Sequence, residues 1–326
     1  MAGKFRRQSI VAPYIDGLLL EKRANGYAYE SEELVLNRFD TYCIRNGLEK
    51  PEITKDFLRE WMEQKEDEGA FNQGKRISCI RQLLMYMATS GMRVYIPHDF
   101  CHFKKSLPHI FDQMELAAFF QEIDSHQPPQ GRITEVRLSG EYKMIFRLYC
   151  CCGLRNSEAA GIATENADLE NGVLTILTSK GKRDRLVYLS DDLKTSCQNY
   201  YVWLCNSLGF IPRWFFPGRN PDKPIPNTTL GSVFNRFWTK TRYAGCNNKP
   251  TIHDFRFTFV VNRMNRWAEE GLDLQVMMPY LSRYLGHKST NETFYYYYLV
   301  SDAYRTVAKK DSVACDVIPE VKHYEK

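Results

Sequence analysis

The stretch 281–300, LSRYLGHKSTNETFYYYYLV, holds two residue types that could carry out chemistry on a phosphate. His287 follows a leucine and a glycine in a short turn, and Tyr296 comes nine residues later inside a run of four tyrosines. Attack of a tyrosine hydroxyl on a phosphodiester builds negative charge on the non-bridging oxygens, so several donors have to surround that phosphate. The question is therefore whether the rest of the chain supplies such donors.

Basic side chains suited to this task occur at three other places. Arg155 lies in GLRNSEAAGI, Lys180 lies in TSKGKRDR, and His253 and Arg256 lie in TIHDFR. Arginine binds phosphate oxygens through two parallel hydrogen bonds and keeps its charge, which suits Arg155 and Arg256. Histidine titrates near neutral pH, so His253 or His287 could help to deprotonate the tyrosine or donate to the phosphate. Lys180 is our candidate for the general acid that protonates the departing 5′ oxygen.

Each of these residues taken alone has a more ordinary explanation. An arginine after a helix end is more often a cap or an ion-pair partner, and a single histidine is more often structural. Four consecutive tyrosines on a helix point in directions about 100° apart, so at most one or two of them face a site. Chemistry on a phosphate is indicated by the combination of these residues and by their order along the chain. The chain has no G-x-x-x-x-G-K-[ST] phosphate loop and no H-E-x-x-H helix, so we expect chemistry without a metal or cofactor.

Length and composition indicate the class of protein that would carry such a site. With 326 residues the chain exceeds the usual size of a single core, so two domains are expected. It has 44% hydrophobic residues, no apolar run of membrane length and no secretory pattern at its start, so we expect a cytoplasmic globular protein without membrane contact. The ten cysteines lack zinc spacing and are expected to be reduced and buried. A net charge of +5 does not by itself indicate nucleic-acid binding.

The first part of the chain predicts a small helical domain. Apolar residues recur at spacings of three and four in four segments, 9–24, 30–46, 54–67 and 72–89. The last of these helices places three basic residues on or near one solvent face, and a proline-containing stretch without helical period, 101–110, is expected to link two domains. The candidate DNA contacts of this half are Lys75, Arg76, Arg81, Lys104 and Lys105. For any such run, a merely solvated face is the more frequent explanation.

The second part predicts helices that flank a small sheet. Helices are expected at 112–127, 138–152, 156–162, 191–207, from 227 to about 243, from the TIHDFR segment to 267, and from about 274 onward. The pattern alternates at 166–169, 173–178 and 185–189, which predicts three short strands with Asn171-Gly172 as a tight turn. Lys180 then lies on the second hairpin with Lys182, Arg183 and Arg185, in a loop that could reach a DNA groove or the site. Glu158 could brace a nearby arginine.

The successive segments GLRNSEAAGI, TSKGKRDRLVYLS, TIHDFR and LGHKSTNETFYYY resemble the motifs of the tyrosine recombinases, also called phage integrases or lambda-integrase-like recombinases. The resemblance covers about 111–300, and the helical first part is similar to the core-binding domain of that family. It implies a mainly α protein in four parts. These are a helical, SAM-like core-binding domain at 1–100, a linker at 101–110, an α+β catalytic domain with a small three-stranded antiparallel sheet at 111–300, and a tail at 301–326 that could contact another subunit.

The resemblance also implies roles for single residues. The phosphate-activating set would be Arg155, Lys180, His253, Arg256 and His287, with Glu158 supporting the first arginine and Lys182 and Arg183 contacting DNA. Tyr296 would be the nucleophile, because the family nucleophile commonly lies nine residues after the Leu-Gly-His histidine, with a threonine, here Thr293, three residues before it. Tyr295 and Tyr297 are the alternatives. Tyr298 stands where many members have a histidine, a departure outside the catalytic set.

The implied activity is site-specific recombination of double-stranded DNA through a 3′-phosphotyrosine, carried out by a homotetramer on two DNA sites, with room for accessory DNA-bending proteins. Integration or excision of a phage or mobile element in a prokaryotic cytoplasm, at the nucleoid, is the expected role. Xer-like resolution of chromosome dimers is the alternative. Two competing interpretations are a type IB topoisomerase, which relaxes supercoils without a specific site, and a catalytically silent DNA-binding protein of the same fold.

Overall fold

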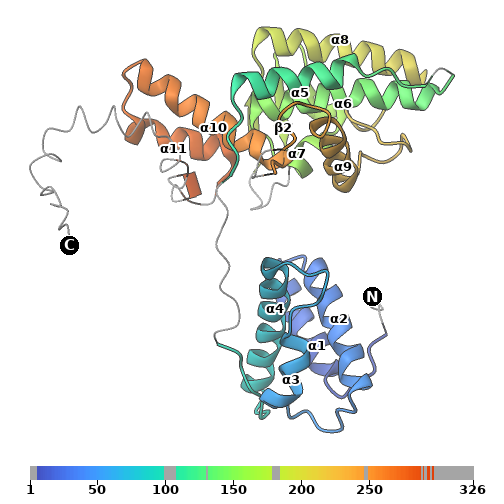
Figure 1. The fold of residues 1–326 in the computed structure, drawn as a ribbon, viewed down its shortest axis with the longest axis vertical. Coiled ribbons are helices and arrows are strands. Elements are labelled where there is room, and N and C mark those ends of the chain that lie inside the picture. The colour runs from blue at the N-terminus through green and yellow to red at the C-terminus, as the bar shows by residue number, and fades with distance from the viewer. Residues whose placement is uncertain are drawn as a thin grey trace, which may run out of the picture. The chain divides into compact units, whose positions relative to one another are not determined.

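The computed structural model describes residues 6–98, 108–129, 131–177, 184–245, 249–287, 289, 292–293 and 296 (Figure 1). The chain divides into two compact units, Met1–Ser106 and Leu107–Lys326. The division places residues 107–110, which we expected in the linker, with the second unit. The expected class is confirmed, since helices dominate and the strands form one small antiparallel sheet. Within the described residues no helix has the length and apolar character needed to cross a membrane.

The first unit consists of four helices in its described part. They are α1 (Ala12–Ala24), α2 (Glu30–Arg45), α3 (Lys55–Met62) and α4 (Ala70–Thr89). Thr54 caps α3 by accepting a hydrogen bond from the amide of Phe57 at 3.2 Å. The expected helix 54–67 ends early, at Met62, because the following EQKEDE sequence offers no apolar side chain to bury. Phe39 and Trp61 meet edge to face at 5.0 Å in the core of this unit.

Arg76 corrects one of the predicted DNA contacts. Its side chain is only 6% exposed, and it donates to both oxygens of Glu68, at 2.8 and 2.5 Å, and to the carbonyls of Trp61 and Glu63. The prediction of a solvent-facing Arg76 was wrong because residue 76 shares its helix face with the buried Cys79 and Leu83, three and seven positions later. The arginine therefore fastens the loop after α3 to α4.

The other basic residues of that prediction differ in their surroundings. Lys75 is exposed, with its ammonium 4.4 Å from the ring centroid of Phe71, and Arg81 is half-buried, with Nε donating to the carbonyl of Pro97 at 3.1 Å. Lys104 and Lys105 lie outside the described residues. Lys75 remains the most accessible described candidate of this group.

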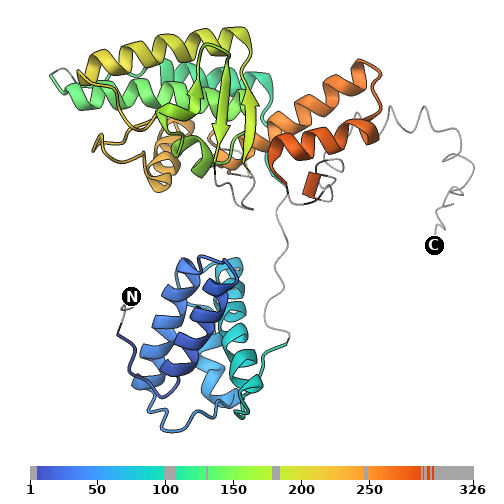
Figure 2. The same ribbon diagram turned by 180° about the vertical axis from the view of Figure 1, so that it is seen from behind.

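The second unit has seven described α-helices, a short 3-10 helix at Thr164–Asn166 and the sheet. The helices are α5 (Gln113–Ser125), α6 (Ile133–Cys152), α7 (Asn156–Ala160), α8 (Asp191–Leu208), α9 (Asn227–Trp238), α10 (Ile252–Glu269) and α11 (Leu274–Leu285). The strands β1 (Ala167–Asp168), β2 (Val173–Ile176) and β3 (Arg185–Tyr188) pair in that order. Figure 2 shows them as neighbouring arrows beside α11, which contacts β3. In both views α6 and α8 lie side by side, and α10 and α11 form a second pair.

Two helix ends of the second unit differ from the sequence prediction by about a turn or more. α6 begins at Ile133 rather than 138, and its added turn contains Arg137, whose guanidinium pairs with the buried Glu141 one turn later and donates to the carbonyl of Gly218 at 2.9 Å. α9 ends at Trp238 rather than 243, where the hydroxyl of Thr241 donates to the carbonyl of Trp238 at 2.8 Å and turns the chain. Polar side chains decide both ends by bonding to local backbone or to a buried partner.

Aromatic side chains hold α5, α6 and α9 against the first turn of α10. Phe119 of α5, Phe146 of α6 and Phe234 of α9 meet Phe255 of α10 in one buried cluster, and the rings of Phe119 and Phe146 lie 5.2 Å apart. Phe255 anchors the first turn of α10 in this core. Its neighbour Arg256 is consequently held at a fixed depth.

Candidate active site

The first part of the site is the turn between α6 and α7. α6 ends at Cys152 and is followed by Gly153, whose φ of 60° is left-handed and whose Cα lies so close to the ring of Phe259 that a Cβ would come within 2.5 Å of it. Arg155 precedes α7, and Glu158 accepts its backbone amide at 2.9 Å and its NH1 at 2.7 Å. The carboxylate thereby caps the helix and orients the arginine at the same time.

The second part is the first turn of α10. Asp254 caps it by accepting hydrogen bonds from the amide of Thr251 at 2.6 Å and from its hydroxyl at 2.9 Å. The other oxygen of Asp254 accepts from the amide of His109 at 3.2 Å, and the amide of Phe111 donates to the hydroxyl of Thr258 at 2.9 Å. This double attachment orders the turn that carries His253 and Arg256.

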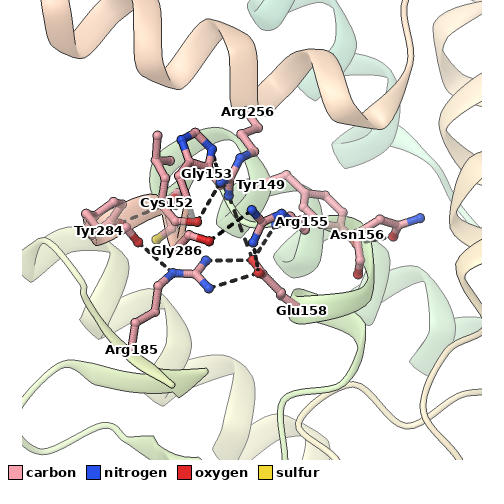
Figure 3. A network of polar contacts seen from close by, with 12 residues as sticks. Tyr149, Cys152, Gly153, Arg155, Asn156, Glu158, Arg185, Arg256, Tyr284 and Gly286 are labelled. Carbon is pink, nitrogen blue, oxygen red and sulfur yellow. Dashed lines mark hydrogen bonds and ion pairs between the residues drawn. The ribbon is translucent and has the colours of Figure 1, made fainter. Parts of the chain in front are cut away.

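Arg256 joins three segments of the second unit (Figure 3). Its NH1 donates to the carbonyl of Gly153 at 2.8 Å, and its NH2 donates to the carbonyl of Leu285 at 2.7 Å and lies 3.0 Å from Nε2 of His287. The residue is 1% exposed. Burial, followed by the charge of Arg155, lowers the pKa of Arg256 to about 10, so the guanidinium keeps its charge at neutral pH.

His287 is held as a neutral imidazole. Because an arginine only donates, Nε2 accepts from Arg256, which leaves the proton on Nδ1 for donation to the hydroxyl of Thr293 at 2.7 Å. Burial, followed by the charges of Arg256 and Arg155, lowers the pKa of His287 to about 3. At neutral pH this side chain therefore carries no charge of its own, and because both ring nitrogens are engaged it orients Arg256 and Thr293.

Tyr296 lies against this histidine. Its ring is nearly parallel to that of His287, with 5.9 Å between centroids and 15° between planes, and it lies 5.0 Å from the ring of Phe257. Phe257 also contacts His253 edge to face at 5.0 Å. Burial raises the pKa of the Tyr296 hydroxyl, while the charge of Arg256 and hydrogen bonding with it act in the opposite direction. Tyr295 and Tyr297 lie outside the described residues.

Glu158 is the centre of the charge arrangement (Figure 3). Besides Arg155, it accepts NH1 and NH2 of Arg185 at 2.9 and 2.7 Å, and NH1 of Arg256 lies 4.0 Å away. Burial acts to raise the pKa of Glu158, but the hydrogen bonds and charge of Arg185, followed by those of Arg155, lower it to about 2. Three guanidinium groups thus surround one carboxylate, and the cluster keeps an excess of positive charge.

The sequence prediction placed Arg185 in a hairpin loop that could reach a DNA groove or the site, but gave it no role there. It was grouped with the lysines of the second hairpin, but it is the first residue of β3 and its side chain is 6% exposed. The burial of β3 alternates, with Arg185 and Val187 facing inward. An arginine in phase with the inward residues of a short strand was the available signal. Lys180, Lys182 and Arg183 lie outside the described residues.

The described part of the chain therefore brings together five of the candidates, Arg155, Glu158, Arg256, His287 and Tyr296. His253, which is more exposed, joins them through Phe257, and partial burial followed by the charge of Arg256 lowers its pKa. Arg155 keeps 18% of its side chain exposed. Among the described residues no group of His, Cys, Asp and Glu is arranged to hold a metal ion. The arrangement can bind an anion and present a phenol to it.

Comparison with known proteins adds independent information. The model of the phage integrase family matches residues 126–303. A Sinorhizobium fredii protein named integrase/recombinase y4rE is 28% identical over 297 residues, covering 83% of this chain and 86% of its own length. Tyrosine recombinase XerD of Proteus mirabilis is 23% identical over 305 residues, covering 90% and 89%.

Solved structures share the fold. The Tn1549 transposon integrase in complex with transposon right end DNA has a TM-score of 0.63 at 16% identity, over 93% of this chain and 99% of that one. A lambda integrase dimer bound to a COC′ core site has a TM-score of 0.60 at 15% identity, over 89% and 77%. At such low identity the likeness concerns the arrangement of helices and strands.

Proposed function

This chain belongs to the phage integrase family of site-specific DNA recombinases, and on that premise we propose that Tyr296 cleaves DNA by forming a 3′-phosphotyrosine. The observation that carries this proposal is the contact between Tyr296 and the cluster of His287 and Arg256. A phenol buried beside an arginine-rich centre is placed to attack a phosphate that the same centre binds.

The two arginines of the sequence motifs have different tasks in this proposal. Arg155 is the more accessible, since its NH1 binds Glu158 while NH2 makes a longer contact of 3.3 Å with the carbonyl of Gly286. We assign it to the non-bridging oxygens of the scissile phosphate. Arg256 binds backbone carbonyls on two sides, so it supplies fixed positive charge and holds the turn that carries His287.

Proton transfer completes the reaction. Burial keeps the Tyr296 hydroxyl protonated at neutral pH, so its attack on phosphorus needs a proton acceptor. Of the two histidines, His253 is the candidate, because both ring nitrogens of His287 are already engaged with Arg256 and Thr293. As the tyrosine oxygen bonds to phosphorus, the bond to the 5′ oxygen breaks, and Lys180 is proposed to protonate that oxygen. The phosphotyrosine conserves the bond energy, and a 5′ hydroxyl from another strand reverses the step.

The biological role that we propose is integration or excision of a phage or mobile element, by a tetramer on two DNA sites with accessory DNA-bending proteins. The similarity to a protein named integrase/recombinase supports it. Similarity to XerD supports the alternative of chromosome-dimer resolution. Contacts of Lys75, Arg81, Lys104, Lys105, Lys182 and Arg183 with DNA phosphates, and location at the nucleoid, belong to the same proposal.

The proposal is tested by trapping the protein on duplex DNA with a nick near the cleavage position, followed by mass spectrometry of the attached peptide. The substrates would be the ends of the element that carries the gene, or sites selected from a random pool. A 3′-phosphate on Tyr296 is the expected result. An adduct on Tyr295 or Tyr297 would move the nucleophile by one residue, and tight binding without any adduct would favour a silent DNA-binding protein. Relaxation of supercoils without a specific site would favour a topoisomerase.

A further inference from the structure

We propose that Arg185 is a positioning residue of the recombinase site, an inference that rests on the function proposed above. It fixes the carboxylate of Glu158 and the turn before His287 in one geometry. Three nitrogens of its guanidinium donate within the second unit: NH1 and NH2 to the two oxygens of Glu158, at 2.9 and 2.7 Å, and Nε to the carbonyl of Tyr284, at 2.6 Å (Figure 3). With these nitrogens engaged and 6% of the side chain exposed, Arg185 acts on DNA only through its neighbours.

The first neighbour is Glu158. A bidentate pair fixes the plane of a carboxylate, because both oxygens have to face the guanidinium fork. Glu158 in turn accepts hydrogen bonds from the backbone amide and NH1 of Arg155. The orientation of Arg155 therefore depends on Arg185 indirectly, through Glu158. Without Arg185, the carboxylate of Glu158 would be free to turn toward Arg155 and Arg256; NH1 of Arg256 lies 4.0 Å from it. Closer ion pairs with these two arginines would weaken the positive charge available to bind the phosphate.

The second neighbour is the Leu-Gly-His turn. Gly286 has a φ of 66°, and a Cβ on it would lie 3.2 Å from NH1 and 3.3 Å from Cδ of Arg185, so the turn closes directly on this side chain. Arg185 also holds the carbonyl of Tyr284, two residues before Gly286. The position of His287, the next residue, therefore follows from the same arginine.

Arg185, Gly286 and His287 line a cavity of about 940 Å³ that is partly open to solvent. This cavity provides a route for a small cation to reach the space that truncation of Arg185 would leave. The guanidinium ion has the planar shape and donors of the lost group, so it can re-form the bidentate pair with Glu158.

The test compares Arg185→Ala and Arg185→Lys with the wild type in single-turnover adduct formation on nicked DNA, with the Kd for the same DNA measured in parallel. We expect Arg185→Ala to be about 10- to 100-fold slower, the size of loss that follows removal of residues that orient the ligands of a metal site, with Kd within about twofold. Arg185→Lys should recover little of the rate, because an ammonium cannot form the fork. Arg219→Ala, which removes an exposed ion pair with Glu135 in the same unit, is the matched control.

Two further readouts separate positioning from a merely structural role. Millimolar guanidinium should restore part of the rate of Arg185→Ala and leave the wild type and Arg219→Ala unchanged. The acid limb of the rate should move to higher pH in Arg185→Ala, since the largest influence that lowers the pKa of Glu158 is gone. A variant that has lost only folded protein would show neither change.

The outcomes distinguish failure of the Arg185 role from failure of the proposed function on which it rests. If the wild type forms no adduct, the proposed function fails, and this inference fails with it. If the wild type reacts and both Arg185 variants react at its rate, only the role of Arg185 is overturned. Should Arg185→Ala not fold, Arg185→Lys decides, because it keeps a positive charge beside Glu158, and a wild-type rate in the folded Arg185→Lys protein would refute the proposal.

Discussion

Buried arginines occur in both units, but the charge around them is balanced differently. In the first unit Arg76 meets the carboxylate of Glu68 and two backbone carbonyls, so one positive charge faces one negative charge. In the second unit Arg155, Arg185 and Arg256 share the single carboxylate of Glu158. A neutral pair closes on itself and holds the fold, whereas a surplus of buried charge needs an anion to complete it. Charge balance, more than burial, therefore separates the structural arginine from those to which we propose a role in cleavage.

The largest effect is expected from the group that the surplus charge serves. Tyr296→Phe removes the attacking oxygen and should abolish covalent attachment, while the Kd for duplex DNA stays within about twofold because the positive groups remain. Denaturing gel electrophoresis of the trapped complex measures the first effect and a binding titration measures the second. Tyr280→Phe, at an exposed tyrosine of α11, is the control and should retain full adduct formation.

The balanced pair is tested by Arg76→Ala, which should lower the free energy of unfolding of the first unit by about 3 to 5 kcal/mol, since it leaves Glu68 without its cation. Denaturant unfolding followed through Trp61 checks this. Arg59→Ala removes an exposed pair with Asp56 and should change little. Once folded and saturated with DNA, the Arg76→Ala protein should cleave at the wild-type rate, and a slower chemical step would contradict the structural role of Arg76.

The surplus itself is tested by Arg155→Ala, for which we expect cleavage about 10²- to 10³-fold slower, because one preorganised donor to the phosphate is lost. The rate of adduct formation at saturating protein is the measurement. Arg147→Ala removes an arginine of the same unit that pairs with Asp124 at the surface, and it should retain the wild-type rate. Equal losses in both variants would show that total charge, and not position, matters.

Acid gives the smallest effect and tests Glu158 without mutation. Its pKa of about 2 in the folded protein lies below the value of about 4.3 for an unfolded glutamate, so its stabilising contribution is complete above about pH 4.3 and is lost as pH falls toward 2. By pH 3 the loss should amount to about 1.5 to 2 kcal/mol of unfolding free energy. Chemical denaturation of the wild type and Glu158→Gln between pH 6 and pH 3 checks this. Parallel pH profiles would argue against an ionised, paired Glu158.

The comparison of the two clusters also explains what the sequence could predict. Periodicity and turn signals located every described α-helix and strand but missed the short 3-10 helix Thr164–Asn166, and the order of the motifs anticipated that Arg155, Arg256 and Tyr296 would meet. The sequence did not predict the burial of Arg76 and Arg185. Both stand in phase with buried neighbours, but an arginine suggests solvent unless its partner is known. Those partners, Glu68 and Glu158, lie 8 and 27 residues away and become neighbours only through folding.

The attachment of residues 109–111 to α10 has a consequence for the smallest fragment that can work. The amide of His109 donates to Asp254, and the amide of Phe111 donates to Thr258, on either side of the turn with Arg256. A truncated protein that starts after Phe111 would lose both donors and leave the Thr258 hydroxyl buried without this partner. If the second unit is expressed by itself, its first residue therefore has to lie upstream of His109. A protein that begins closer to α5 would lose these contacts, and its low activity would be mistaken for a defect in the catalytic residues.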